Sequence, residues 1–437
     1  MAIIFVLLLA LVAAVWYGAF AAAVYPPEAA LPWIARREGL YLTGLASFAL
    51  MSLTMLLAVR PAWLEKPLGG MDRIYRLHKW TGILAVGLGA AHWLVELSGD
   101  IIKSFIGKAG RLPKPQHDGL YAQLRELAED MGEWALYAAL AILVLTLWKR
   151  FPYHWWRHVH RAMPALYLML AFHAALLAPS AYWAQPAGAL LALCLAVGVP
   201  AAFVSLAGRI GQRRQVSGSV AAVNQCVDVT EIDCRLDGQF AHRPGQFAFV
   251  TFDAKEGAHP FTIASADRGD GMVRFCVKAL GDHTRRLGQT LVAGQPVRVE
   301  GPYGRFQLDR RDPQRRQVWV AGGVGVTPFL AWLEALQARP ETSMPADLHY
   351  CTRDSTTDAF VGRLEALCAG LPAIRLRLHD ARRGELLDAG MLGLADGGKP
   401  KAEVWYCGPL GLAEVLRGGL ARLGSGARFH QEAFEMR

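Results

Sequence analysis

Four histidines stand out by residue type and spacing in the first half of the sequence. His78 and His92 lie 14 positions apart, and His160 and His173 lie 13 positions apart. A helix rises about 1.5 Å per residue, so each pair would span roughly 20 Å along a helix axis. Two antiparallel helices would then bring His78 to His160 and His92 to His173. Because neutral imidazole binds haem iron well, each facing pair could supply both axial ligands of one haem.

The second histidine pair poses a question of helical geometry. Fourteen positions return to within about 40° of the same helix face, whereas thirteen miss it by about 140°. Pro164 lies between His160 and His173, and a proline can kink and re-register a helix. His158 is the alternative ligand, because its 15-residue distance from His173 misses the face by only about 60°. The residues alone leave this choice open.

These histidines lie in a half of the chain that is poor in charge. Residues 1–212 hold 28 charged side chains, whereas residues 213–437 hold 55. A bilayer core needs about 20 apolar residues per helix. The sequence predicts six such spans, at 1–25, 39–59, 76–95 and 134–148, with two more in the uncharged stretch 162–208, divided near 178–180. The first span resembles a signal peptide at 21–23, but it has no positive N-terminal region, and we expect a retained helix.

The distribution of basic residues predicts the orientation. If the second half is cytoplasmic, the loops 60–79 and 149–161 are cytoplasmic too. With Arg209, Arg213 and Arg214 they carry 12 Lys and Arg residues, against 7 in the exterior loops. The excess of positive charge on the inside supports this orientation. The stretch 98–132 would be the main exterior loop, and its lysines and arginines are expected to be solvated.

Composition excludes several classes of protein. Hydrophobic residues make up 53% of the chain, so disorder, a collagen and a small disulfide scaffold are excluded. The net charge of +9 divides as +6 and +3 between the halves, which indicates cytoplasmic loops and no nucleic-acid partner. The seven cysteines include no CxxC pair. Neither a zinc site nor an iron–sulfur cluster is therefore supported, and the cysteines fit a reduced compartment.

The second half of the chain contains two different sequence patterns. Residues 215–310 alternate in short segments with turn signals, which predicts an antiparallel β-barrel. From residue 316 on, strand-like runs alternate with helix-like runs, which predicts a parallel α/β sheet. Those strand-like runs are Gln317–Ala321, Ala346–Tyr350, Ile374–Leu378 and Glu403–Cys407. We place the domain boundaries at 1–212, 213–312 and 313–437.

Two glycine-containing segments of the second half have the layout of phosphate sites. A helix starting near Thr284, just after Gly281, would offer backbone amides to a diphosphate. A strand at 318–321 runs into Gly322-Gly323-Val324-Gly325-Val326-Thr327-Pro328 and then into a helix, the layout for a pyrophosphate at a helix N-terminus. It is not the GxGxxG fingerprint. Arg353 follows the next strand and could bind a 2′-phosphate.

With these segments in series, the sequence resembles the ferric reductase and NADPH oxidase superfamily over nearly the whole chain. The His-x13-His and His-x12-His pairs resemble the bis-haem helices of that family, which favours His160 over His158. The second half resembles ferredoxin–NADP reductase-type dehydrogenases. The resemblance implies a membrane all-α six-helix bis-haem bundle, an antiparallel β-barrel FAD domain and an α/β parallel-sheet nucleotide domain.

The resemblance also implies roles for individual residues. His259 would take the phosphate side of FAD, Phe261 would pack on the flavin and Thr262 would approach its reactive nitrogen. The remaining FAD-binding residues would be Pro260, Ser265, Lys278, Gly281 and Thr284. The nicotinamide nucleotide would be bound by Gly322, Gly323, Gly325, Thr327, Pro328, Arg353, Gly408 and Pro409. Cys407 and Phe434 would complete the catalytic set, Phe434 as the aromatic that shields the flavin.

The implied activity is electron transfer from NADPH (or NADH) through FAD and two b-type haems to an exterior acceptor. Arg353 favours NADPH. We expect O2 as acceptor, giving superoxide; the alternatives are a ferric chelate reductase and a haem-bearing donor to a periplasmic partner protein. The protein would lie in a bacterial-type inner membrane, in contact with lipid, with its dehydrogenase part cytoplasmic. A six-helix channel is disfavoured by the flavin and nucleotide segments.

Overall fold

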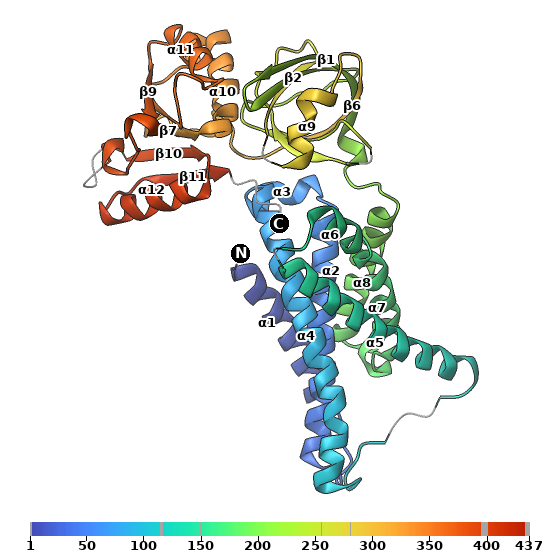
Figure 1. Cartoon of the computed structure of the whole chain (residues 1–437). Helices are drawn as coiled ribbons and strands as arrows, with labels where there is room; N and C mark the ends of the chain where they lie inside the picture. The colour runs from blue at the N-terminus through green and yellow to red at the C-terminus, as the bar shows by residue number, and fades with distance from the viewer. Residues whose placement is uncertain are drawn as a thin grey trace. The chain divides into compact units, whose positions relative to one another are not determined.

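The computed structural model describes residues 2–113, 117–148, 150–254, 256–279, 281–394 and 401–432. The chain divides into two compact units. One unit contains residues 1–68 and 73–210 and is helical; the other contains residues 211–437 with 69–72 and holds all the described strands (Figure 1).

The helical unit carries eight α-helices among the described residues. They are α1 (Ala2–Ala21), α2 (Leu31–Ala58), α3 (Ala62–Leu68), α4 (Met71–Ile106), α5 (Gly119–Leu147), α6 (Tyr153–His160), α7 (Met163–Leu177) and α8 (Pro186–Leu206). Five of these, α1, α2, α4, α5 and α8, are long and apolar enough to cross a membrane. They confirm five of the six predicted spans. The remaining one corresponds to α7, whose 15 residues measure only roughly 22 Å, against a bilayer core of about 30 Å.

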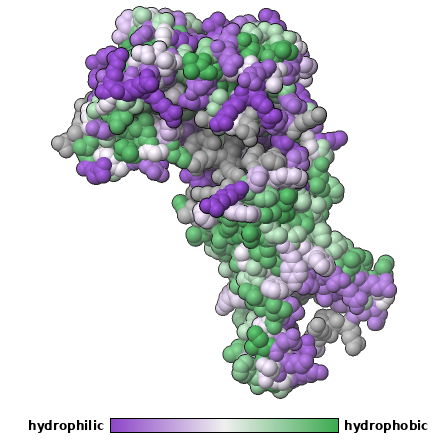
Figure 2. Space-filling view, viewed as in Figure 1, coloured by the Kyte–Doolittle hydropathy of each residue, from purple (hydrophilic) through white to green (hydrophobic). Residues whose placement is uncertain are grey.

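Apolar side chains cover much of the visible helical surface, whereas polar side chains dominate the strand-rich unit (Figure 2). Large apolar residues such as Val6, Phe105 and Leu193 are more than half exposed. An apolar surface of this kind is suited to lipid contact. Inside the unit, Leu50 and Leu57 of α2 and Ala85 of α4 are almost completely buried.

The predicted exterior loop at 98–132 is mostly helical. Helix α4 continues to Ile106 and α5 begins at Gly119, so only residues 107–118 lie between them. Arg36 and Arg37, which are two of the seven basic residues counted in the exterior loops, lie within α2. The prediction was wrong because hydropathy marks where an apolar stretch ends, whereas a helix with charged side chains continues wherever its backbone hydrogen bonds are satisfied.

The single helix predicted to carry His160 and His173 is instead two helices. Helix α6 ends at His160, and α7 begins at Met163 with Pro164 in its first turn. A proline is tolerated there because the first turn of a helix leaves its N–H groups unpaired in any case. The break removes the angular mismatch of about 140° that a continuous helix would impose.

The second unit begins with a six-stranded antiparallel sheet. Its strands are β1 (Gln215–Cys226), β2 (Val229–Leu236), β3 (Phe247–Thr251), β4 (His259–Thr262), β5 (Met272–Lys278) and β6 (Pro296–Tyr303), in the order β4-β3-β6-β1-β2-β5. An antiparallel bridge between Ile263 and Phe275 joins the two outer strands, so the sheet curls around its core. Helix α9 (Asp282–Thr290) follows β5.

A five-stranded parallel sheet completes this unit. Its strands are β7 (Arg316–Gly322), β8 (Ala346–Thr352), β9 (Ile374–Asp380), β10 (Ala402–Cys407) and β11 (Arg428–Glu432), in the order β11-β10-β7-β8-β9. The helices are α10 (Thr327–Ala338), α11 (Val361–Ala369) and α12 (Leu410–Arg422). The four predicted strands are confirmed and β11 is additional. The strand order reverses between β7 and β10, where open α/β sheets bind ligands beyond the carboxyl ends of their strands.

Candidate functional site

The four histidines meet in two pairs within the helical unit. The ring centres of His78 and His160 lie 6.2 Å apart at an interplanar angle of 74°. Those of His92 and His173 lie 6.3 Å apart at 85°. Helix α4 contributes one ring to each pair, and the end of α6 and the middle of α7 contribute the others. The pairing expected from the spacing is therefore present, and the His160 ring faces that of His78.

Backbone carbonyl groups orient three of the four rings. The Nδ1 atom of His78 lies 3.1 Å from the carbonyl oxygen of Thr54, and that of His92 lies 3.0 Å from the carbonyl oxygen of Leu40. The Nδ1 atom of His173 lies 2.8 Å from the carbonyl oxygen of Ala128. A carbonyl oxygen can only accept a hydrogen bond, so Nδ1 must be the protonated donor. The Nε2 atom then keeps its lone pair, the arrangement typical of a metal-bound histidine.

Glycines make room for the rings of the second pair. A Cβ atom on Gly44 would lie 3.1 Å from Nδ1 of His92, and one on Gly132 would overlap with the His173 ring. Gly132 also lies one helical turn after Ala128, whose carbonyl holds that ring. Sequence reasoning missed both glycines and all three carbonyl groups. The only sequence signal is a glycine one helical turn after a carbonyl acceptor. That signal can be recognised only when the pairing of the helices is already known.

The two pairs fit bis-imidazole ligation of haem iron. Two imidazoles on opposite sides of one metal, at the nitrogen–metal distance of about 2.0–2.1 Å known for zinc, have ring centres roughly 6 Å apart. A metal held by protein alone usually needs three or four side chains. Within the described ranges, no group of three or more His, Cys, Asp or Glu residues could hold a metal. Two axial ligands per site instead suit an iron whose other positions a porphyrin fills.

The predicted flavin segment forms strand β4 and the turn after it. Thr262, which is almost buried, pairs with Phe247 of β3, and Phe261 pairs with Ala248. The Ser265 hydroxyl accepts a hydrogen bond of 3.1 Å from the backbone amide of Arg274. These contacts hold the segment against both neighbouring strands.

The predicted diphosphate segment caps helix α9. The Gly281 amide donates a hydrogen bond of 2.9 Å to the Thr284 hydroxyl. Lys278, at the end of β5, lies 3.1 Å from the Asp228 carboxylate. Its ammonium group also lies 3.8 Å from the position of a Cβ atom on Gly323. The predicted diphosphate segment and the glycine-rich segment are thereby neighbours in space.

The glycine-rich segment packs directly on the end of β10. A Cβ atom on Gly325 would overlap with the Cys407 carbonyl group, and one on Gly322 would lie 2.7 Å from the Pro409 ring. Thr327 then begins α10, with Pro328 in its first turn. Burial raises the pKa of the Cys407 thiol well above its usual value. The predicted nucleotide residues therefore gather at the switch point between β7 and β10.

Two remaining predicted residues lie at the edges of this site. Arg353 is exposed just beyond β8, where its carbonyl oxygen accepts a 3.1 Å hydrogen bond from the Arg382 amide. Phe434 lies outside the described residues. The last described residue, Glu432, has a carboxylate oxygen 3.0 Å from the position of a Cβ atom on Gly304. The C-terminal strand thus reaches the antiparallel sheet that carries the flavin segment.

Family comparisons divide the chain in the same way. Residues 43–171 match the family described as ferric reductase like transmembrane component, and residues 217–307 match the family described as FAD-binding domain. The chain therefore combines a ferric reductase-like transmembrane component with an FAD-binding domain. Five long apolar helices and an FAD-binding domain are the parts that a membrane-bound flavin oxidoreductase would need.

Two similar curated proteins are named as a reductase subunit and an oxidoreductase. The carnitine monooxygenase reductase subunit of Escherichia coli is 33% identical over 155 residues, 35% of this chain and 45% of that protein. The NADPH oxidoreductase of Mycobacterium tuberculosis is 25% identical over 248 residues, 54% of this chain and 64% of that protein. The chain spans about half the length of the curated relatives it matches. Among solved structures, flavohemoglobin from Malassezia yamatoensis has a TM-score of 0.46 at 17% identity, covering 77% of this chain and 92% of its own.

Proposed function

We propose that this protein transfers electrons from NAD(P)H, by way of FAD and two b-type haems, to an acceptor on the opposite face of the membrane. The observation that carries the proposal is the two imidazole pairs, three of whose rings donate Nδ1–H to a backbone carbonyl, in a chain with an FAD-binding domain. Residues 1–212 would form the haem domain, 213–312 the FAD domain and 313–437 the nucleotide domain. The excess of Lys and Arg supports a cytoplasmic dehydrogenase part.

Each cofactor would be held by groups of this chain already described. Bound FAD would accept a hydride from NAD(P)H, and haem would carry single electrons. His78 and His160 would hold one haem; His92 and His173 would hold the other. The carbonyl groups of Thr54, Leu40 and Ala128 keep the proton on Nδ1, so that Nε2 can bind metal. The helix N-terminus at Gly281 and the glycine-rich segment at 322–325 would offer amides to phosphates.

We propose dioxygen as the acceptor, giving superoxide. Two basic side chains on the side of the His92–His173 pair are already paired with carboxylates: Arg36 lies 2.7 Å from Glu96, and Arg37 lies 3.4 Å from Glu38. Because these charges neutralise each other, they suit a small neutral acceptor better than an anionic chelate. The description of the family matched by residues 43–171 favours ferric chelate reduction as the second candidate. Transfer to a periplasmic protein partner would be a third outcome.

Oxygen dependence of turnover tests the acceptor. NADPH consumption by the purified, FAD-supplemented protein is measured with and without air, with a dismutase-sensitive probe for superoxide. Dismutase-sensitive turnover in air supports the proposal. Haem reduction without oxygen turnover, restored by a ferric chelate, would overturn dioxygen in favour of ferric reduction. Reduced haems that pass electrons to neither would indicate a protein acceptor, and a preparation without a Soret band would contradict haem altogether.

A substitution of Gly132 is expected to disturb one haem only. An alanine Cβ would overlap with His173, so the ring must leave its 2.8 Å contact with the Ala128 carbonyl. Loss of such an orienting partner typically costs about 10- to 100-fold in affinity or activity. We expect one of two redox titration steps to shift in Gly132→Ala. Gly87→Ala on α4 is the matched control, because its Cβ would meet no atom within 4 Å. An unchanged titration in Gly132→Ala would contradict the ligand role of His173.

Arg353 is expected to set part of the nucleotide preference. Arg353 is exposed just beyond β8, where its backbone carbonyl accepts a hydrogen bond from the Arg382 amide. An arginine side chain can bind phosphate in a bidentate manner. Arg353→Ala is expected to lower kcat/KM for NADPH about 10-fold, with little change for NADH, since a charge-assisted hydrogen bond contributes about 1.5–3 kcal/mol. Arg339→Ala, also exposed in this domain, is the control. An unchanged ratio of kcat/KM for NADPH to kcat/KM for NADH would contradict a contact between Arg353 and the 2′-phosphate.

A further inference from the structure

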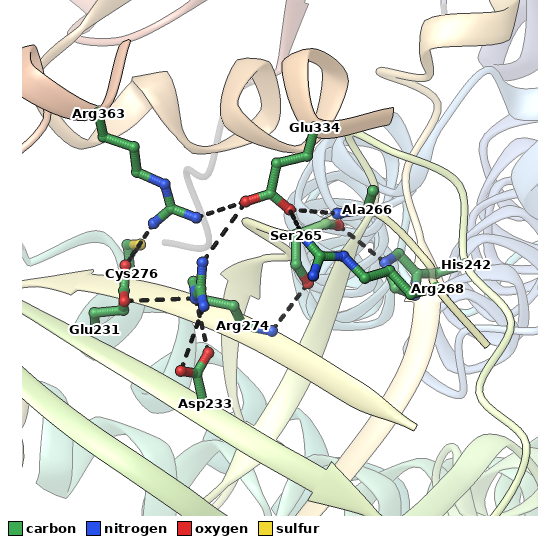
Figure 3. Close-up of polar contacts among 10 residues, drawn as sticks. All are labelled: Glu231, Asp233, His242, Ser265, Ala266, Arg268, Arg274, Cys276, Glu334 and Arg363. Carbon is green, nitrogen blue, oxygen red and sulfur yellow. Dashed lines mark hydrogen bonds and ion pairs between the residues drawn. The ribbon is translucent and has the colours of Figure 1, made fainter. Parts of the chain in front are cut away.

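A network of charged side chains joins the nucleotide domain to the strands of the FAD domain (Figure 3). Its centre is Glu334 on α10, which is only 9% exposed. Oxygen Oε1 of Glu334 lies 2.6 Å from Nη2 of Arg363 on α11 and 3.6 Å from Nη1 of Arg274 on β5. Its second oxygen, Oε2, accepts a hydrogen bond of 3.2 Å from the Ala266 amide. One carboxylate therefore contacts both domains of the dehydrogenase.

Two more carboxylates complete the network on the side of the FAD domain. Nη1 of Arg363 lies 2.6 Å from Glu231. Arg274 holds Asp233 by two hydrogen bonds, of 2.7 and 3.4 Å. With Arg268, whose Nη2 lies 3.8 Å from Glu334, three guanidinium groups balance three carboxylates. The network therefore has no net charge, and its directional contacts cross the interface between the two domains.

The network ends at both predicted cofactor segments. Ala266 follows the flavin segment 259–265 directly, and the amide of Arg274 donates to the Ser265 hydroxyl. On the other side, α10 begins at Thr327, directly after the glycine-rich segment, and Glu334 lies two turns further along it. Trp332, on the same helix, donates from its indole N–H to the Pro244 carbonyl at 3.1 Å. Helix α10 is thus attached to the FAD domain at two points.

Adhesion between the domains does not require these charges. Apolar contact is already present, because the buried rings of Phe306 and Trp332 stack 5.2 Å apart across the interface. Moving ions out of water is costly, and an apolar replacement of equal volume is often as stable as a buried ion pair. What arginine–carboxylate pairs add is a defined geometry, because their hydrogen bonds have fixed directions.

We propose that Glu334 is a positioning residue that holds the nucleotide domain and the FAD domain in the relative position needed for hydride transfer. The inference rests on the proposed function. In that reaction NAD(P)H loses a hydride, two electrons with one proton, and becomes NAD(P)+, while FAD gains them. The Glu334 side chain contacts the Ala266 amide, directly after the flavin segment, and it acts by placing α10.

The test is stopped-flow reduction of FAD by NADPH in the full-length protein under anaerobic conditions. Glu334→Gln keeps the size of the side chain and an acceptor for the Ala266 amide but removes the charge. We expect the rate at saturating NADPH to fall about 10- to 100-fold, since a misplacement of about 1 Å can cost 100-fold. The Kd for NADPH should stay within about twofold, because nucleotide contacts lie elsewhere. Glu334→Asp should recover part of the rate, and Glu365→Gln, exposed on α11, should match the wild type.

Variants of Arg363, the ion-pair partner of Glu334, provide a second test of the inference. Arg363→Gln alone should also slow flavin reduction, and the double variant Glu334→Gln/Arg363→Gln should be slowed by less than the product of the two single effects. A wild-type rate in Glu334→Gln, or a weaker NADPH Kd with an unchanged saturating rate, would overturn the inference. If Glu334→Gln loses FAD, the inference is judged on Glu334→Asp: FAD retained with a slower rate supports it, and FAD lost or a wild-type rate overturns it. Failure of the wild type to reduce FAD with NADPH would instead refute the proposed function.

Discussion

Replacement of His92 by alanine is expected to leave one haem per chain in place of two and to abolish electron transfer across the membrane. Its ring faces His173 at 6.3 Å between centres and is oriented by the Leu40 carbonyl at 3.0 Å. Among the described residues, no third His, Cys, Asp or Glu side chain groups with this pair to replace the lost ring. Loss of a residue that only orients a metal ligand can cost about 100-fold in activity. Loss of the axial ligand itself should therefore lower the rate of acceptor reduction by at least about 100-fold.

The reduction of FAD by NADPH should remain within about twofold of the wild-type rate in this variant. Haem content is measured as the haem-to-protein ratio, and flavin reduction is followed anaerobically. The removed ring leaves a backbone carbonyl without its donor, which costs about 1–3 kcal/mol and is tolerable for a protein of ordinary stability, about 5–15 kcal/mol. Two haems retained in His92→Ala, or flavin reduction lost with it, would contradict the assignment.

His158 provides the matched control for this experiment. It lies two residues before His160 on α6, and the helix turns about 200° between them. We expect His158→Ala to keep both haems and His160→Ala to lose one. The opposite outcome would show that His158 is the ligand. The comparison thus decides between the two residues that spacing alone left open.

Substitution of Gly325 by alanine is expected to have the second largest effect, on the nucleotide side. The added Cβ would overlap with the carbonyl group of Cys407 and crowd the Gly408 amide at 2.8 Å. Both are backbone groups at the end of buried strand β10, so neither can rotate away. Overpacking of this kind costs about 1–3 kcal/mol, which corresponds to roughly 10- to 100-fold in kcat/KM for NAD(P)H.

Cofactor content should separate this effect from unfolding. FAD and haem should be retained in Gly325→Ala, because both are held by other parts of the chain under the proposed function. Gly418→Ala on α12 serves as control, since its Cβ would meet no atom within 4 Å. A normal kcat/KM for NAD(P)H in Gly325→Ala would show that the glycine-rich segment does not carry the nucleotide.

Local patterns in the sequence were sufficient for most of the elements. Runs of uncharged residues predicted six spans, of which five are long apolar helices. Short alternating segments with turn signals predicted the antiparallel sheet, and strand-like runs between helix-like runs predicted four strands of the parallel sheet. These signals work because burial of a helix or strand requires a periodic apolar face, which is visible within one segment. The ends of α4 and α5 were missed because a helix extends beyond its apolar part.

The spacing of His78 and His92 also determined their separation, because both lie on one continuous helix. The same argument failed for His160 and His173. Their helix breaks at residues 161–162, which spacing could not show, although Pro164 pointed to the place. The functional roles of these residues, and of those in the flavin and nucleotide segments, stay predictions until the experiments above are done.

Only the tertiary structure decided which groups support the candidate site. It identified the carbonyl groups of Leu40, Thr54 and Ala128 as partners of the histidines and Gly132 as the space for one ring. It also placed Glu334 against Arg363 and Arg274. A backbone carbonyl has no residue type to recognise, and Glu334 and Arg274 lie 60 positions apart in the sequence. Such contacts arise from the packing of distant segments and leave no local periodicity, so the sequence alone determined the elements and the tertiary structure determined their partners.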